Sequence, residues 1–181
     1  MWPSKYGHAY AHIKEKEVVM MPKLDVIAEF RKDHRRVRDG LLEIIGALQS
    51  RDVAKARGIL GGLDTLLGPH FRFEEEVLYP TLRAFLGEYV DQLLHEHDGV
   101  IDTARSCAEL LQKESLTDEE AEQAANAARA LLVHVSNCDG LAILTERLEP
   151  GELDQLSEKF AAAREAGVPL LEWVETIRQS V

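Results

Sequence analysis

The sequence predicts an all-α protein, most simply an up-and-down four-helix bundle with a C-terminal helical appendage. Apolar residues recur at steps of three and four through four long segments, which is the period of an amphipathic helix. No segment alternates convincingly with the period of two that a strand requires. The 181 residues are also enough to bury a core in one domain.

The first long helix is predicted over residues 24–48. Its apolar stripe consists of Ile27, Phe30, Val37, Leu41, Ile44 and Leu48, and His34 lies within it. The second is predicted over residues 52–79, with Asp52 as N-cap and Pro80 ending the helix. Gly68-Pro69 predicts a kink in this helix or, alternatively, two separate helices.

The third helix is predicted over residues 89–113. The fourth opens with a capping box from Thr117 to Glu120 and ends before Pro150.

Three regions are expected along the chain. Residues 1–22 lack clear periodicity and form an N-terminal extension, residues 23–148 form the bundle, and residues 149–181 form C-terminal helices packed on it. Two short helices are predicted in the last region, over 152–165 and 169–179.

Charge and cysteine content exclude several functions. The 21 basic and 32 acidic residues give a formal charge of −11, and the basic residues are scattered. We therefore expect no nucleic-acid or membrane partner. Two cysteines, Cys107 and Cys138, do not indicate a disulfide framework. The N-terminus lacks a signal-peptide core and no segment is expected to span a bilayer, so a cytoplasmic location is predicted.

Four histidines lie in the middle of the apolar stripes, one on each long helix: His34, His70, His97 and His134. Buried imidazoles with nearby acids need a shared charge, and a metal cluster is the simplest candidate. Glu74 lies one helical turn after His70, so the two share a face. Glu75, Glu76 and His95 rotate away from these faces and are predicted to be solvated.

The fourth helix leaves its acidic ligand open. Asp139 lies about 140° round from His134 on an ideal helix, whereas Cys138 stands at the i+4 position. A local π-type turn, eased by Gly140, would let Asp139 reach a metal, and we favour this interpretation. Alternatively, Cys138 is a thiolate ligand, or it is a small buried residue and one carboxylate is missing.

The order of these residues resembles the hemerythrin-like, or HHE cation-binding, domain over roughly residues 24–148. The resemblance is carried by His34, by HFRFEEEVLYP from His70, by the EH pair ending at His97, and by His134 with its following acid. It implies a non-haem centre of two iron ions, bridged by two carboxylates and an oxo or hydroxo group. The implied ligands are His34, His70, Glu74, His97, His134 and Asp139, with Glu74 and Asp139 as bridges.

The chain departs from oxygen-carrying hemerythrins at its third helix. Those proteins have a fifth histidine in an HxxxH pair, but here Leu93 and Ile101 occupy the positions four residues from His97. Tyr79, His8, His12 or water could fill the gap. Imidazole and carboxylate ligands also suit manganese or zinc.

The resemblance implies a protein that binds dioxygen or a related small oxidant for storage or sensing. The alternatives are a catalase-like or peroxidase-like di-iron enzyme, or a protein that handles nitric oxide or iron. A metal-free helical module that acts through partners is a third class. The sequence leaves enzymatic activity and oligomeric state open.

Overall fold

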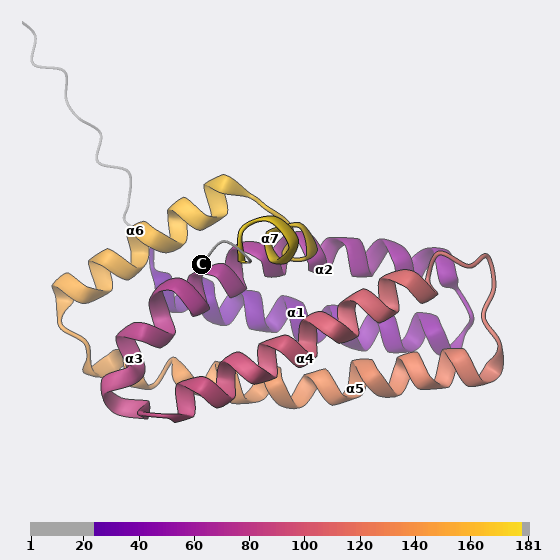
Figure 1. The fold of residues 1–181 in the computed structure, drawn as a ribbon, viewed down its shortest axis with the longest axis horizontal. Coiled ribbons are helices and arrows are strands. Elements are labelled where there is room, and N and C mark those ends of the chain that lie inside the picture. The colour runs from indigo at the N-terminus through magenta and orange to yellow at the C-terminus, as the bar shows by residue number, and fades with distance from the viewer. Residues whose placement is uncertain (1–23, 179–181) are drawn as a thin grey trace, which may run out of the picture.

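The structure is a computed structural model that describes residues 24–178. These residues form an elongated bundle of helices with no strand, which confirms the predicted all-α class (Figure 1). The N-terminal extension predicted for residues 1–22, with His8 and His12, lies outside the described residues.

Four long helices form the bundle. They are α1 (Val26–Gln49), α2 (Val53–Phe73), α4 (Tyr89–Leu110) and α5 (Asp118–Leu141). α1 packs against α2 and α5, and α4 contacts the same two helices. At the end remote from the histidines the core is aliphatic, with leucine, isoleucine and valine side chains facing small alanines of α5. These alanines let α5 approach α1 closely.

Helix starts follow the capping residues read from the sequence. Asp52 accepts a hydrogen bond from the backbone of Lys55, and Thr117 and Glu120 form the reciprocal capping box. Both predictions are confirmed. Asp25 caps α1 in the same way by accepting from the backbone of Ala28.

The second helix differs most from its prediction, because it does not end at Pro80. α2 passes into a π-helical segment, η1 (Glu74–Leu78), and then into α3 (Tyr79–Leu86). Pro80 lies in the first turn of α3. A proline is tolerated there because the N–H groups of a first turn are not needed for hydrogen bonds within that helix. The alternative of two helices meeting at Gly68-Pro69 is also wrong, since α2 is continuous there.

Two further helices follow a short 3-10 turn, η2 (Leu144–Arg147). α6 (Pro150–Ala166) packs on α1 and α2, and α7 (Leu170–Thr176) packs on α2 and α4 (Figure 1). They bury large aromatic side chains, Phe160 and Trp173, against the bundle.

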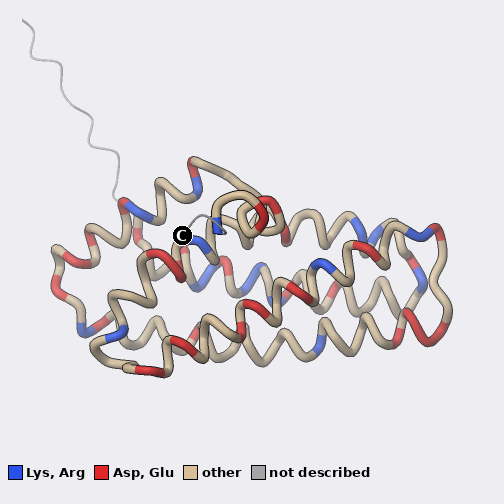
Figure 2. Tube along the Cα trace, in the orientation of Figure 1, with Lys and Arg blue, Asp and Glu red and all other residues tan. Residues whose placement is uncertain are grey.

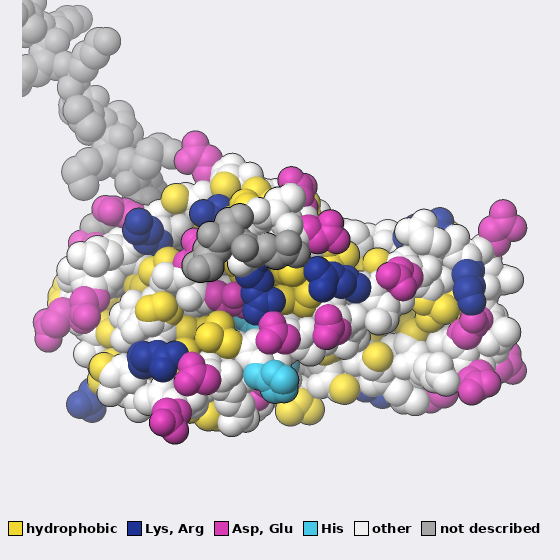
Figure 3. Space-filling model, in the orientation of Figure 1, with side chains coloured by type: hydrophobic (Ala, Val, Ile, Leu, Met, Phe, Trp, Pro, Cys, Tyr) yellow, Lys and Arg dark blue, Asp and Glu magenta, His cyan; other side chains and the backbone are white. Residues whose placement is uncertain are grey.

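Charged residues are distributed over all the helices, without a concentration of Lys and Arg on one of them (Figure 2). On the face shown in Figure 3, charges of both signs are interspersed with apolar side chains.

One stretch, Asp118–Arg147, is long and apolar enough to cross a membrane by length and composition alone, contrary to the sequence expectation. A single stretch of this kind is weak evidence for a span, since the test rests on length and composition alone; 22% of its most apolar window is buried in the fold. Within the fold, α5 packs along α1 and turns Cys138 into the interior.

Candidate metal centre

Four histidines from four different helices meet in the bundle interior. His34, His70 and His97 are buried, and the His134 side chain is 12% exposed. Nε2 of His34 lies 3.2 Å from Nε2 of His70. Aromatic rings hold the imidazoles in place: Phe71 stacks on His97 with ring centroids 3.8 Å apart. The predicted convergence of the four histidines is therefore present.

Glu74 lies between the two histidine pairs. Its Oε2 is 3.2 Å from Nε2 of His97 and 3.5 Å from Nε2 of His70. Both carboxylate oxygens are buried and neither has a hydrogen-bond partner among the described residues. Burial raises the pKa of Glu74, but the surrounding imidazoles outweigh it and lower the pKa to about 2. A buried carboxylate ion that lacks hydrogen bonds calls for a cation beside it.

The outer nitrogen of every histidine faces a carboxylate. The four Nδ1 atoms pair as follows: His34 with Asp139 at 3.4 Å, His70 with Asp33 at 3.5 Å, His97 with Glu75 at 2.9 Å, and His134 with Glu96 at 3.0 Å. The contacts at His97 and His134 are hydrogen bonds, in which the carboxylate accepts from Nδ1–H and so favours the lone pair on Nε2, whereas Nδ1 of His34 and Nδ1 of His70 lie at ion-pair distance without a hydrogen bond. Metal-binding histidines are held in this way by their outer partners.

Two arginines of the C-terminal region hold these outer carboxylates. Arg164 on α6 donates to Oδ2 of Asp33 at 2.8 Å, and Arg178, just past α7, lies 3.2 Å from Oε2 of Glu75. Asp33 is buried, so its ionised form depends on its cationic partners. Burial raises the pKa of Asp33, but His70 and Arg164 outweigh it and lower the pKa.

The surroundings of His34 and His97 shift the pKa values of these two histidines in opposite directions. Burial and His70 lower the pKa of His34 to about 4, whereas Glu74 and Asp139 only partly oppose them. For His97, burial lowers the pKa, but contacts with Glu74 and Glu75 outweigh it and raise the pKa. A lone pair on His34 is therefore available to a metal at neutral pH, and at His97 a cation would replace a proton.

Asp139 and Cys138 occupy different places from those favoured on sequence grounds. The predicted π-type turn in the fourth helix is wrong: α5 is regular to Leu141, and the π-helix lies at Glu74–Leu78 instead. Asp139 consequently points outward, with its side chain 50% exposed, and reaches only Nδ1 of His34. Cys138 is buried, with Sγ 3.5 Å from Nε2 of His134.

Tyr79 also belongs to the interior of the site. Its hydroxyl lies 2.9 Å from Nε2 of His97 and 3.5 Å from Sγ of Cys138. Burial and the neighbouring Glu74 raise the pKa of Tyr79, and burial and Glu74 also raise that of Cys138. Leu93 and Ile101, the residues four positions from His97, are buried and apolar and offer no ligand atom. Tyr79 is the polar side chain beside His97 that was considered on sequence grounds as a replacement for the fifth histidine.

Sequence reasoning missed the outer carboxylates. Glu75 was predicted to be a surface charge, and this is wrong, since its side chain is 10% exposed and bonded to His97. Glu76 is exposed and pairs with Arg72, as expected of a surface residue. A signal for the others was present in the DH and EH pairs. Asp33 and Glu96 each precede a histidine on their own helix but hold the histidine of the next helix along the chain.

The donor atoms fit a transition-metal ion. Two groups of three residues each bring their ligand atoms within 4.8 Å of one another: His34, His70 and Glu74, and His97, His134 and Cys138. Imidazole, carboxylate and a single sulfur suit iron, zinc or manganese, and do not suit calcium or magnesium.

The fold and the site define a metal-binding four-helix bundle protein. A family model described as the Hemerythrin HHE cation binding domain matches residues 25–141. The chain therefore belongs to this family, which confirms the resemblance seen in the sequence. Neither the curated proteins nor the solved structures contain a significant match to the chain. The α6 and α7 helices, with Arg164 and Arg178, lie beyond the matched residues.

Proposed function

We propose that the chain holds two iron ions between its four histidines and binds dioxygen or a similarly small oxidant there. The observation that carries the metal pair is the position of Glu74, whose buried carboxylate contacts a histidine of each pair. One carboxylate oxygen set between two imidazole groups suits a bridge between two cations. Bound iron supplies the electrons that an oxidant accepts.

A small cavity supports an oxidant of this size. It has a volume of about 30 Å³ and reaches His34, His70, Glu74 and His134. Its other walls are apolar: Val37, Leu41, Leu67, Phe71, Val100, Leu131 and Val135. A cavity this large admits a water or a diatomic molecule. Its apolar walls favour dioxygen or nitric oxide over a strongly hydrated solute.

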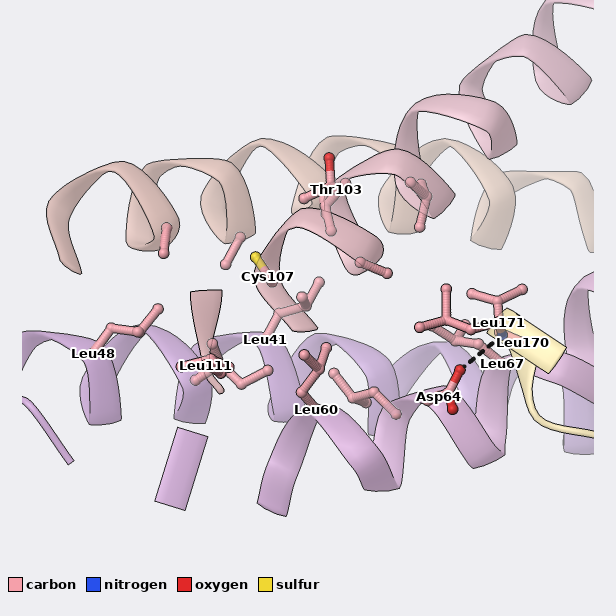
Figure 4. A pocket seen from close by; sticks show the side chains of 17 residues that line it. Leu41, Leu48, Leu60, Asp64, Leu67, Thr103, Cys107, Leu111, Leu170 and Leu171 are labelled. Atoms are coloured by element: carbon pink, nitrogen blue, oxygen red, sulfur yellow. Dashed lines mark hydrogen bonds between the residues drawn. The ribbon is translucent and has the colours of Figure 1, made fainter. Parts of the chain in front are cut away.

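A second apolar cavity of about 50 Å³ lies further along the bundle core (Figure 4). Leu41 and Leu67 line both cavities, so the two adjoin. The backbone N–H of Leu171 donates a hydrogen bond of 2.9 Å to Asp64, a polar residue among the mostly apolar walls of this cavity. An apolar interior next to the imidazoles supports the binding of an uncharged gas.

Peroxide turnover is the second candidate, and Tyr79 is the observation that favours it. Its buried hydroxyl touches His97 and keeps its proton, because burial and Glu74 raise its pKa, so it can donate a hydrogen bond inside the apolar site. A hydrogen bond to the leaving oxygen assists cleavage of an O–O bond.

The test begins with metal content. Protein expressed with added iron is expected to contain about two irons per chain and, when oxidised, to absorb in the near ultraviolet through oxo-to-iron charge transfer. His97→Ala is expected to lower the iron content, while the matched variant of an exposed neighbour, His95→Ala, leaves it unchanged. Colourless protein without bound metal would contradict the proposal. A reversible spectral change on exposing reduced protein to dioxygen supports gas binding, and oxygen evolution from hydrogen peroxide supports the enzymatic alternative.

Replacing Arg164 with methionine is expected to weaken iron binding by up to about 10-fold, less than the usual 10- to 100-fold cost of losing the direct partner of a ligand, because Arg164 acts on His70 through Asp33. The loss removes the guanidinium that holds Asp33 against His70. Competition with a chelator measures the affinity. Arg72→Met, which breaks only the surface pair with Glu76, is the control and should match the wild type. Equal affinities for all three proteins would contradict a role for α6 in the site.

A further inference from the structure

The two halves of the site offer different donor atoms. His34 and His70 bring two nitrogens to Glu74, whereas His97 and His134 bring two nitrogens to a sulfur. Cys138 follows His134 by four residues on a regular helix, and Glu74 follows His70 by the same number of residues, at the start of the π-helical segment. The sulfur therefore occupies the place that a second bridging carboxylate would take.

We propose that Cys138 binds a metal ion through its sulfur and completes a position with His97 and His134. The Oε2 atom of Glu74 is the fourth donor, so the position has two nitrogens, one sulfur and one oxygen. The sulfur binds as a thiolate, and its proton passes to solvent as the sulfur–metal bond forms. The role of Cys138 rests on the proposed pair of metal ions.

Two of the distances between donor atoms are close to those of a tetrahedral set of ligands. Bonds of about 2.0–2.3 Å to zinc-like ions place neighbouring donors about 3.3–3.7 Å apart. Sγ of Cys138 lies 3.5 Å from Nε2 of His134, and Oε2 of Glu74 lies 3.2 Å from Nε2 of His97. The three ligand atoms of His97, His134 and Cys138 all lie within 4.8 Å of one another, and the outer carboxylates orient both imidazoles.

The burial of these donors is a second and independent reason to place a cation at this position. The Glu74 oxygens, which face this position, are fully buried and have no hydrogen-bond donor among the described residues. Cys138 itself is 1% exposed, and its sulfur contacts polar groups, the His134 ring and the Tyr79 hydroxyl. A thiolate makes this half of the site softer than the half with His34 and His70. The centre is therefore asymmetric, with zinc or ferrous iron favoured at the sulfur.

Titration with cobalt(II) chloride tests the assignment, because a thiolate bound to cobalt gives an intense near-ultraviolet charge-transfer band. The wild type is expected to show this band. Cys138→Glu, which keeps a donor at the same spacing, should bind as much cobalt without the band. Cys138→Ala should lose the band and about half of the bound cobalt. Cys107→Ser is the matched control, since Cys107 lines the apolar cavity away from the histidines and should behave as the wild type.

The outcomes separate this assignment from the proposed function. Cobalt bound by the wild type without a charge-transfer band, or a band that persists in Cys138→Glu, overturns the sulfur ligand. In either case, two irons that respond to dioxygen would leave the proposed function standing. A clear thiolate band in a protein that never loads an iron pair would support the sulfur ligand and overturn the proposed function. Far-ultraviolet circular dichroism of each variant shows that its helices are intact.

Discussion

Glu74→Gln is expected to leave the protein with less than one iron per chain. The carboxylate is the one anionic group among the described residues that contacts a histidine of each pair, and glutamine keeps its shape while removing its charge. Losing a charged bridge costs more than losing an outer partner, so an affinity loss of at least about 100-fold is expected. Elemental analysis of protein purified after iron-supplemented expression measures this loss.

A neighbouring acid provides the control for this variant. Glu76 lies in the same π-helical segment, but it is exposed and pairs with Arg72 on the surface. Glu76→Gln should keep its iron and its near-ultraviolet absorption. If Glu74→Gln also kept both, the metal would have to lie elsewhere, and the bridging role of Glu74 would be refuted.

Gly68→Ala is expected to destabilise the protein by about 3 kcal/mol, at the upper end of the cost of overpacking. A Cβ at this position would lie 1.9 Å from the carbonyl oxygen of Val168 and 2.6 Å from the carbonyl carbon of Pro169. These are backbone atoms, so the clash cannot be relieved by turning a side chain. The chain entering α7 must move away from α2, and Trp173 then loses part of its packing.

Thermal unfolding of the metal-free protein measures the effect, which corresponds to a Tm about 6–12 °C lower for a chain of this size. Gly62→Ala is the matched control on the same helix, since a Cβ added there would meet no atom within 4 Å. That substitution should stabilise the protein slightly, because alanine favours a helix more than glycine does. Equal melting temperatures for the two variants would contradict the close approach of α7.

The fold could be predicted from the sequence because each long helix carries its own signals. The stripe around His34 and the caps at Asp52 and Thr117 are local patterns, and each appears in the structure as expected. Pro80 was misinterpreted because a proline after a π-helical turn can open a new helical segment. The π-helix itself has no comparable local pattern.

The inward residues of the site could be predicted for a similar reason, since apolar periodicity tells which face a histidine takes. Their outer partners could not. Glu75 was placed by the rotation of an ideal helix, and the π-helix begins one residue before it. Asp33 contacts a histidine on another helix, and spacing along one helix contains no information about such a contact. Arg164 is further still, 131 residues along the chain from Asp33.

The ring of outer carboxylates has an electrostatic consequence for the oxidation state of the site. Each arginine that holds an outer acid is shared with a second carboxylate: Arg164 pairs with Asp33 and Glu29, and Arg178 pairs with Glu75 and Asp98. The ionised acids around the histidines therefore outnumber their arginine partners, and the surroundings of the site are net negative. In the proposed centre, this excess of negative charge in a medium of low dielectric constant would favour the more highly charged, oxidised metal ions.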